Sequence, residues 1–310
     1  LAPAAAVDAP TAPPAIRRPA PRPPRALLPA GLSVTAIETL VRDPYAVYAR
    51  HVLKLDPLDP VAAAPGAAER GTLVHDALGN FAIAFPGALP DDPLAEVLRL
   101  GRAAFAPLAV YPDVTALWWP RFEQVARAFA AWEAARRPAI GKLAAEIQGR
   151  FEISVPGGVF MLSARADRIE ERTHGPTLIV DFKTGAPPTP AQIFAGFAPQ
   201  MTLEAAMLKR GAFPGIAASD DVALLYMLAK GGREPLAEKP VEPPRGETRA
   251  VAQVIEEHFA GLQALLRRYY GGEAGFVSRP FAEYARREGP YDHLARVREW
   301  SVLTGAGEDA

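Results

Sequence analysis

The stretch Leu178-Ile-Val-Asp-Phe-Lys183 decides how the rest of the sequence is interpreted. Three apolar residues that favour β-structure lead directly into an aspartate and, two residues later, a lysine. Side chains alternate between the faces of a strand, so Asp181 and Lys183 share one face and Phe182 takes the other. Burying such charges is costly unless they are paired or bind a metal. The stretch therefore predicts either an ordinary ion pair at a strand end or part of a cation-binding site.

The length and composition are those of a globular protein. The 310 residues are 49% apolar and 22% charged, which allows one large or two small domains. No apolar run is long enough to span a membrane, and no signal-peptide pattern is visible. Cysteine is absent, which excludes disulfides, thiolate zinc sites and cysteine-ligated iron–sulfur clusters and fits a reducing cytoplasm. The net charge of −1 excludes a strongly basic DNA-coating protein and predicts weak DNA binding by the chain alone.

The N-terminal segment differs in composition from the rest. Residues 1–31 are rich in alanine and proline and carry four arginines, Arg17, Arg18, Arg22 and Arg25. Such a segment cannot bury enough apolar surface to offset the entropy lost on ordering, so we expect a disordered linker. Order is expected from Leu32 to about residue 304, as one domain. The chain begins with leucine, which is compatible with a piece of a longer protein.

Helical patterns dominate the first half of this domain. Ser33 or Thr35 can cap a first helix, Pro44 separates it from a second, and apolar residues at steps of three and four predict the others. We expect helices over residues 33–41, 45–52, 68–81 and 93–137 and, beyond the strands, from residue 190, from residue 200 to 208, and over 248–270 and 291–300.

The pattern changes to a period of two after about residue 146. Residues 150–155 alternate, Pro156-Gly157-Gly158 forms a turn, and a second strand over 159–169 carries Asp167 near its end. The strand of Asp181 comes next, a fourth strand covers 222–228, and 231–246 is expected to be a connection. This order of elements predicts an α/β fold, a mixed sheet with helices packed on it.

Five polar residues fall where these elements are expected to converge: His75, Asp167, Asp181, Lys183 and Gln200. Two carboxylates and a neutral imidazole suit a hard divalent ion, Mg²⁺ or Mn²⁺. Lys183 could orient or deprotonate an attacking water or stabilise charge on a phosphoryl group. Gln200 could place the nucleophile or bind phosphate. Each residue taken alone has a simpler interpretation, as an ordinary core or surface group.

The same residues carry a resemblance to a known family. The sequence is similar to the PD-(D/E)XK nuclease superfamily, of the RecB type, and most of all to the C-terminal nuclease domains of AddB helicase–nuclease subunits, over about residues 32–302. The matching pieces, in the family's order, are Gly71-x-x-x-His75, Ala166-Asp167-Arg168-Ile169, Asp181-Phe182-Lys183-Thr184-Gly185 and Pro199-Gln200.

The resemblance implies a restriction-endonuclease-like core, a mixed central sheet flanked by helices, with helical additions at both ends. It implies that His75, Asp167 and Asp181 bind metal. It also implies that Asp167, Asp181, Lys183 and Gln200 are catalytic, Gln200 being the motif glutamine beside the site. The implied activity is Mg²⁺-dependent exonucleolytic hydrolysis of DNA, with Mn²⁺ as a substitute, during end processing and recombinational double-strand break repair. The implied partners are single-stranded DNA or duplex ends and an AddA-type helicase–nuclease subunit.

Two positions depart from the family's pattern. Many relatives hold an iron–sulfur cluster through four cysteines, one of them just before a Pro-Tyr pair, where this chain has Asp43. No cluster is expected here, and packing alone is expected to join the N- and C-terminal segments. A tyrosine often follows the motif glutamine by four residues, where this chain has Glu204.

Two alternatives remain at this level. His75-Asp76 could belong to an HD phosphohydrolase, but that class needs further histidine and aspartate ligands on an all-helical fold, and this chain has five histidines and a run of strands. The second alternative is a catalytically silent nuclease-like module that guides DNA or docks a helicase. Because Asp167, Asp181 and Lys183 are all retained, an active enzyme is favoured.

Overall fold

The computed structural model describes residues 16–58, 64–281 and 289–301 of the chain. These residues divide into two compact units. The larger unit combines Pro29–Glu38 with Leu58–Gly271 and contains the sheet. The smaller unit combines Thr39–Pro57 with the described residues up to Leu28 and from Gly272 onward. In the described residues no helix is both long and apolar enough to cross a membrane.

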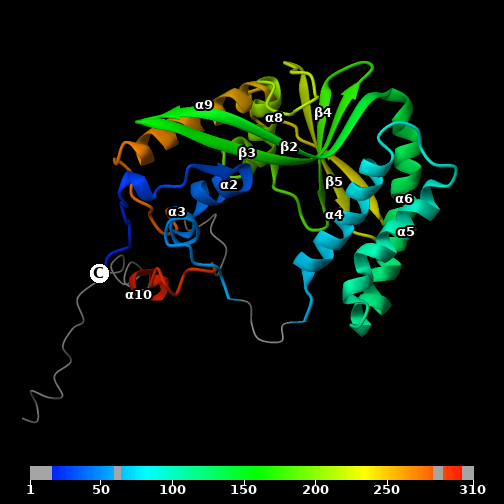
Figure 1. The fold of residues 1–310 in the computed structure, drawn as a ribbon, viewed down its shortest axis with the longest axis horizontal. Coiled ribbons are helices and arrows are strands. Elements are labelled where there is room, and N and C mark those ends of the chain that lie inside the picture. The colour runs from blue at the N-terminus through cyan, green and yellow to red at the C-terminus, as the bar shows by residue number, and fades with distance from the viewer. Residues whose placement is uncertain (1–15, 59–63, 282–288, 302–310) are drawn as a thin grey trace, which may run out of the picture. The chain divides into compact units, whose positions relative to one another are not determined.

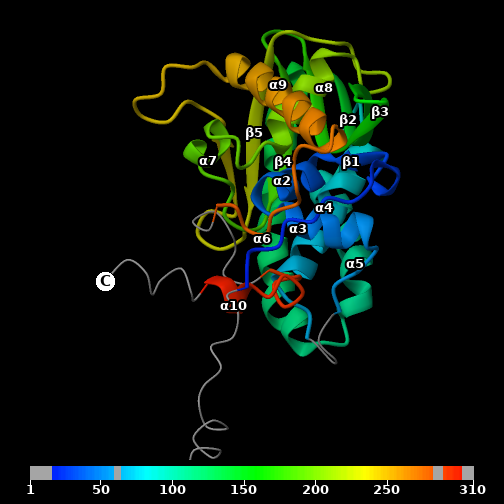
Figure 2. The same ribbon diagram turned by 90° about the vertical axis from the view of Figure 1, so that its left-hand side faces the viewer.

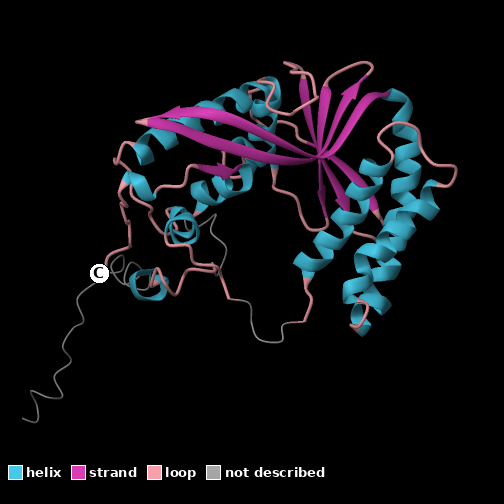
Figure 3. Cartoon of the chain, in the orientation of Figure 1, coloured by secondary structure: helices cyan, strands magenta, loops and turns pink. Residues whose placement is uncertain are grey.

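A six-stranded mixed sheet forms the centre of the larger unit (Figures 1 and 3). The strands follow the order β1-β3-β4-β5-β6, and β2 pairs with β3 outside this path. The β1–β3 and β4–β5 pairs are parallel and the other pairs are antiparallel. The bounds are β1 (Gly31–Ser33), β2 (Ile140–Val155), β3 (Gly158–Arg172), β4 (Thr177–Lys183), β5 (Val222–Ala229) and β6 (Leu236–Pro240).

A two-residue turn sets the register of the long β2–β3 hairpin. Val155 pairs with Gly158 across Pro156 and Gly157, and Gly157 adopts a positive φ of 75° that a glycine accommodates without strain. The pairing then continues down the hairpin to Ala145 and Arg168 and beyond. A fixed turn determines which residues oppose each other over the whole length of the two strands.

The strands β3 and β4 stay paired over a short distance only. Three residue pairs join them, the last of which is Arg168 with Val180. Beyond this point β4 continues in parallel pairing with β5 as far as Lys183. The neighbour of β3 changes to β1, which pairs with Met161 to Ser163. Residues 164–167 of β3 therefore border a fork between β1 and β4.

Helices cover both faces of the sheet (Figures 1 and 2). On one face, α4 (Ala67–Ala84), α5 (Pro93–Phe105) and α6 (Trp119–Arg136) share a core with the apolar side chains of β4 and β5. On the other, α8 (Gln200–Lys209) and α9 (Val251–Tyr270) pack against each other and against β2, and α8 also contacts β4 and β5. The short helix α7 (Pro190–Phe194) is capped by the Thr189 side chain.

The smaller unit contains the short helices α3 (Pro44–Val47) and α10 (Val297–Ser301), and α2 (Val34–Arg42) crosses the boundary between the units. Its core joins both ends of the chain, because Tyr45 packs in one cluster with Tyr291 and Trp300. Asp43 accepts a hydrogen bond from the Arg279 backbone N–H at 3.1 Å. The prediction that packing alone joins these segments is therefore wrong, since a polar contact at Asp43 contributes as well.

The fold class predicted from the sequence is confirmed. Several element predictions need correction. The strands β1 and β6 were not predicted, β6 lying inside the expected connection of residues 231–246, and β2 starts ten residues before the expected strand at 150. Residues 93–137 are broken between α5 and α6, and the expected 291–300 helix shortens to α10. Asp167 lies inside β3, five residues before its end, rather than near a strand end.

Part of the expected N-terminal linker lies outside the described residues. Residues 1–15 of the linker are not among the described residues. The same holds for residues 59–63 of the expected loop after the second helix. Within the described part of the segment, the carbonyls of Pro19 and Pro21 accept hydrogen bonds from Ser278 and Phe276. The division of the chain at residue 31 stays a prediction.

Replacing Phe129 by alanine tests the core between α6 and the sheet. Phe129 is fully buried, with ring centroids 5.7 Å from Phe81 and 6.1 Å from Phe182. Phe129→Ala should lower the free energy of unfolding by about 3–5 kcal/mol, because it removes a large buried side chain and leaves a cavity. Leu117→Ala, at a side chain 58% exposed, should change it by less than about 0.5 kcal/mol. Equal effects in urea unfolding would contradict this core.

Candidate functional site

The candidate site lies at the fork where β4 leaves β3. Asp167 is the first residue of β3 beyond the last β3–β4 pair, so its backbone has no partner in β4. Its side chain fills the gap instead, and Asp167 Oδ2 accepts a hydrogen bond from the Phe182 backbone N–H at 2.9 Å. The carboxylate is thereby held against the strand that carries Asp181 and Lys183.

Helix α4 brings His75 to the fork. Gly71, His75 and Gly79 recur every four residues and so share one side of the helix, where the two glycines leave room for close approach. A Cβ at Gly71 would lie 3.1 Å from Thr184 Oγ1. His75 Nε2 is 3.6 Å from Asp167 Oδ2 and donates to the Phe182 carbonyl.

Glu146 on β2 is a site residue that the sequence analysis missed. It lies between Ala145 and Ile147, which pair with Arg168 and Ala166, so it stands opposite Asp167. Its φ of 51° is in the left-handed region, which is uncommon for a residue other than glycine and interrupts the ladder here. The carboxylate also forms an ion pair with Arg165 at 2.7 Å.

Among the described residues, His75, Glu146 and Asp167 form a group able to hold a metal ion. One ligand atom from each lies within 4.8 Å of the others. An imidazole with carboxylate oxygens is a donor set that suits Mg²⁺, Mn²⁺ and similar divalent ions. The turn at Pro156 and Gly157 contained the signal for Glu146, because counting equal steps back from that turn places Glu146 opposite Asp167.

Asp181 and Lys183 form an ion pair beside this group. Lys183 Nζ is 2.6 Å from Asp181 Oδ2, and it lies 5.9 Å from the ring centroid of Tyr226 on β5. Asp181 is buried, with 2% of its surface exposed, while 31% of the Lys183 side chain is exposed. The buried carboxylate therefore has an ammonium group that can reach solvent or a substrate.

Gln200, the first residue of α8, connects two buried carboxylates. Its side-chain amide nitrogen donates to Asp181 Oδ1 at 3.0 Å and to Glu204 Oε1 at 3.2 Å. An amide oxygen in the same place would face two acceptors, so the two carboxylates determine which way the amide points. Glu204 is almost fully buried, with 1% of its surface exposed.

Burial raises the pKa of every carboxyl group gathered here. Desolvation, followed by the charge of Asp181, raises the pKa of Asp167 to about 6. Desolvation is also the main cause of the raised pKa of Asp181 and of Glu146. It raises the pKa of Glu204 well above its ordinary value. So many carboxyl groups close together in a partly buried place favour the binding of protons or of a cation.

Lys183 remains a cation in this setting. Burial alone would lower the pKa of its ammonium group, but the charge of Asp181 and the hydrogen bond to it outweigh burial, and the pKa is raised. Of the roles considered for Lys183, this arrangement favours charge stabilisation and orientation of a water over removal of a proton.

The structure brings together all five residues named from the sequence. His75 and Asp167 meet directly, and Gln200, Lys183 and Asp181 form a connected set. Asp167 accepts a hydrogen bond from the backbone N–H of Phe182, the residue between Asp181 and Lys183, so the two sets lie beside each other. The group with the closest ligand atoms contains Glu146 rather than Asp181. The assignment of catalytic and metal-binding roles stays a prediction.

Comparison with protein families adds independent information. The model of the PD-(D/E)XK nuclease superfamily matches residues 31–277, which include all the residues of the site described above.

Curated relatives match part of this chain. An uncharacterized protein of Rickettsia bellii is 29% identical over 182 residues, covering 59% of this chain and 22% of the relative. An uncharacterized protein of Rickettsia typhi is 27% identical over 189 residues, covering 60% of this chain and 22% of the relative. The chain spans about a fifth of the length of these relatives. The crystal structure of SSO0001 matches 66% of this chain and 80% of its own chain at 15% identity, with a TM-score of 0.25 that is too low to support an argument.

Metal affinity at this site should depend on pH. The pKa of Asp167 is about 6, so below that pH a metal ion must displace a proton from this carboxyl group. We expect the affinity for Mn²⁺ to fall roughly tenfold per pH unit below about pH 6 for each proton displaced. Calorimetric titrations in buffers between about pH 5 and about pH 8 measure it.

The same raised pKa affects stability with the opposite sign. The folded state holds its Asp167 proton more tightly than the unfolded chain, so without metal its contribution to stability decreases as pH rises from about 4 to about 6. For the metal titration described above, a Mn²⁺ affinity that does not change with pH below about pH 6 would contradict the placement of Asp167 in the site.

Gly79→Ala should disturb the site more than the fold. A Cβ at Gly79 would lie 2.7 Å from Glu146 Oε1 and 3.2 Å from its Cγ, so the Glu146 side chain must move. The helix itself gains up to about 1 kcal/mol from the substitution, which offsets the strain. We expect Mn²⁺ affinity to fall about tenfold while the urea midpoint changes little. Gly261→Ala on α9, where a Cβ meets no atom within 4 Å, is the matched control.

Proposed function

The chain belongs to the PD-(D/E)XK nuclease superfamily, and from this premise we propose that it is a metal-dependent nuclease that hydrolyses phosphodiester bonds of DNA. One observation carries the proposal. The fork gathers His75, Asp167 and Glu146 beside the Asp181–Lys183 pair, which combines a cation site with a fixed positive charge. Hydrolysis of a phosphodiester needs both, because negative charge accumulates on the phosphoryl oxygens as the bond breaks.

The residues present fit a hard divalent ion, and we propose Mg²⁺, with Mn²⁺ as a substitute. The donors are oxygen atoms and one imidazole nitrogen. Desolvation, followed by a neighbouring carboxylate, raises the pKa of Asp167 and of Glu146, so a bound cation would favour both charged forms. We assign His75, Asp167 and Asp181 as ligands and add Glu146. When bound, a divalent ion would lower the pKa of a water molecule bound to it and would neutralise negative charge on the phosphoryl oxygens.

The remaining residues bind and orient. Lys183 holds a positive charge on the solvent side of Asp181, where it can contact a phosphate oxygen or an attacking water. Gln200 holds the Asp181 carboxylate through its amide nitrogen, and its amide oxygen remains able to accept a hydrogen bond from a water. Asp167 keeps β4 at a fixed position through the Phe182 N–H. These fixed dipoles and charges need no rearrangement during the reaction.

At a finer level, we propose an exonuclease that acts on DNA ends within an AddB-type helicase–nuclease, with an AddA-type subunit as partner, in recombinational double-strand break repair in the cytoplasm. The sequence motifs support this assignment, and so does the match to only a fifth of much longer relatives, which a nuclease domain of a larger protein would give. In this proposal residues 32–304 form the nuclease domain. The net charge of −1 fits a domain that receives DNA from a partner rather than binding it tightly by itself.

The alternative is a silent nuclease-like module that guides DNA or docks a helicase. The mutual arrangement of Asp181, Lys183 and Gln200 speaks against it, because a silent copy has no reason to keep buried charges that cost stability. The two functions differ in one measurable respect, since a silent module binds DNA but cuts none.

Cleavage of labelled DNA by the 310-residue chain tests the proposal. Linear single-stranded and duplex DNA should be degraded with Mg²⁺ or Mn²⁺ and not with a chelator, while a closed circle remains intact. Asp181→Asn and Lys183→Met should each reduce the rate at least about a hundredfold. The first removes the carboxylate that we assign as a metal ligand, and the second removes a positive charge that stabilises the reacting phosphate.

Asp220→Asn is the matched control, since this aspartate side chain is 99% exposed. It should leave the rate unchanged. Cleavage that persists in the chelator, or an unimpaired Asp181→Asn protein, would overturn the assignment. DNA binding without cleavage, with both metals and with the partner subunit supplied, would establish the silent module instead.

A further inference from the structure

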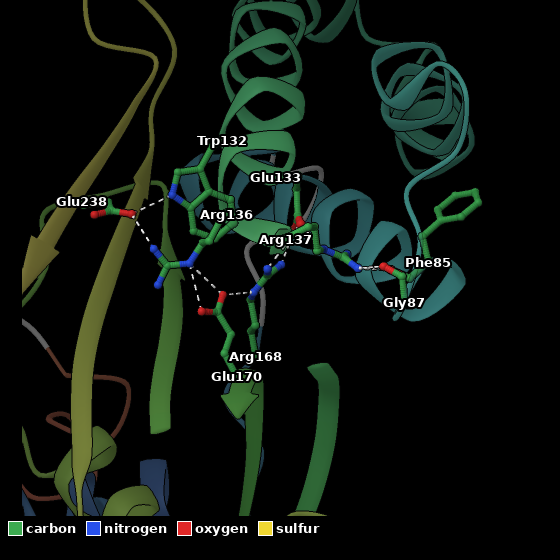
Figure 4. Close-up of polar contacts among 9 residues, drawn as sticks. All are labelled: Phe85, Gly87, Trp132, Glu133, Arg136, Arg137, Arg168, Glu170 and Glu238. Atoms are coloured by element: carbon green, nitrogen blue, oxygen red, sulfur yellow. Dashed lines mark hydrogen bonds and ion pairs between the residues drawn. The ribbon is translucent and has the colours of Figure 1, made fainter. Parts of the chain in front are cut away.

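Charged side chains also gather on the other face of β3. Arg168 follows Asp167 directly, so the two side chains point to opposite faces of the strand. Figure 4 shows Arg168 at the centre of a connected group between β3, α6 and β6. We call this group the buried charge network, and its members are Glu133, Arg136, Arg137, Arg168, Glu170 and Glu238.

The centre of the network is fully buried. Arg168, Glu133 on α6 and Glu170 on β3 each have 0% of their surface exposed. Arg168 Nε donates to Glu170 at 2.7 Å, and both terminal nitrogens of Arg168 donate to Glu133. One guanidinium group therefore joins two carboxylates from two elements, with the fork geometry that arginine offers and lysine does not.

One branch of the network reaches β6. Arg136 Nε donates to both oxygens of Glu170 at 2.9 Å, and its Nη1 donates to Glu238 on β6 at 3.1 Å. The Trp132 indole N–H donates to the same Glu238 at 2.7 Å (Figure 4). The guanidinium groups of Arg168 and Arg136 lie 4.8 Å and 5.0 Å from the Trp132 ring centroid.

The other branch reaches the end of α4. Arg137 Nε donates to Glu133 at 2.5 Å, and Arg137 Nη1 donates to the carbonyls of Phe85 at 2.5 Å and Gly87 at 2.9 Å. These carbonyls follow directly on α4, which ends at Ala84. The network therefore extends from the end of the helix that carries His75 to the residue after Asp167.

Stability alone does not account for these residues. Three arginines and three glutamates balance in charge, but ions taken out of water cost several kcal/mol each, and apolar side chains of similar size often give equal or greater stability. What a network of directed hydrogen bonds adds is a fixed distance and orientation between the elements it joins. Here the elements are α4 and β3, which supply ligand atoms to one cluster.

We propose that the buried charge network is a positioning device that sets His75 against Asp167 and Glu146 at the metal centre. The inference rests on the proposed function, because it assumes that these residues bind a divalent ion. His75 is ten residues before Phe85, which is roughly 15 Å along a helix. A rigid helix tied at its end by Arg137 transmits that position to His75, and Arg168 holds β3 at the residue next to Asp167.

Arg137→Met tests the tie to α4. The substitution keeps much of the side-chain volume but removes the donors to the Phe85 and Gly87 carbonyls and the ion pair with Glu133. Arg168 still pairs with Glu133 and Glu170. We expect the Kd for Mn²⁺ to rise about tenfold, the lower end of the effect of removing groups that support metal ligands. Arg137→Lys keeps the charge and places its donors on a single nitrogen instead of a fork, so it should restore part of the affinity.

Arg168→Lys tests the tie to β3. A lysine keeps the charge but lacks the planar fork by which separate nitrogens of Arg168 reach Glu133 and Glu170, so Mn²⁺ binding should again weaken about tenfold. Nuclease activity of both variants should recover at saturating Mn²⁺, with the KM for DNA unchanged. A purely structural role would lower the folded fraction and leave the metal affinity of folded protein as it was.

The matched control is Arg210→Met. Arg210, the residue after α8, pairs with Glu256 on α9 at 2.6 Å, and its guanidinium carbon lies 3.9 Å from the Phe259 ring centroid. It is therefore also an arginine that joins two elements, although its ion pair is partly exposed. It does not join α4 to β3, and its loss should change stability without changing the Kd for Mn²⁺. Calorimetric titration with Mn²⁺, at a temperature where circular dichroism shows each variant folded, provides the comparison.

The outcomes separate this inference from the proposed function. Wild-type protein that binds no Mn²⁺, or a His75→Ala variant that binds it as well as wild type, overturns the metal centre itself. Wild-type binding that His75→Ala abolishes, together with unchanged affinity in Arg137→Met and Arg168→Lys, overturns only the positioning role. If neither arginine variant folds, the network is a requirement for folding rather than a positioning device, and the inference is also overturned.

Discussion

The site depends on one hydrogen bond, from the Phe182 backbone N–H to the carboxylate of Asp167. Where β3 and β4 part, the N–H of Phe182 has lost its partner on β3, and an unpaired buried N–H is costly. The Asp167 side chain supplies the acceptor, and this holds its charge beside Asp181 and Lys183. The fork is therefore both a topological necessity, since β3 must pair with β1 as well as β4, and the reason that the charges meet where they do.

The site is short of positive charge. Four carboxyl groups lie close together here, of which Asp181 and Glu204 are buried and Asp167 and Glu146 partly buried. Desolvation raises the pKa of each of them. Lys183 balances one of these charges. The rest must be balanced by protons or by a cation, and this is the physical basis for a divalent ion at the fork. The same shortage explains why Lys183 stays protonated and serves better as a charge than as a base.

The two faces of β3 carry different groups of charged side chains. On the face of Asp167 lie the groups that would bind metal and phosphate. The face of Arg168 carries a closed set of ion pairs that joins β3 to α6 and to the end of α4. Helix α4 approaches the fork with the side that carries Gly71, His75 and Gly79. Larger side chains in place of the two glycines would meet Thr184 and Glu146. The position of the imidazole thus depends on close approach on one side and on directed hydrogen bonds on the other.

The sequence by itself determined the α/β class, the β2–β3 turn, and five polar residues that the fold brings to one place, because local period and turn chemistry are properties of neighbouring residues. Glu146 was within reach of the same reasoning, through the register of the hairpin, but carries no motif of its own. The strand β6 and the early start of β2 at Ile140 were not predicted, since pairing partners rather than local pattern define them. Only the tertiary structure decided that β3 continues for five residues beyond Asp167 and that Arg168 faces Glu133. Both follow from which distant segments pair at the fork and pack against its two faces.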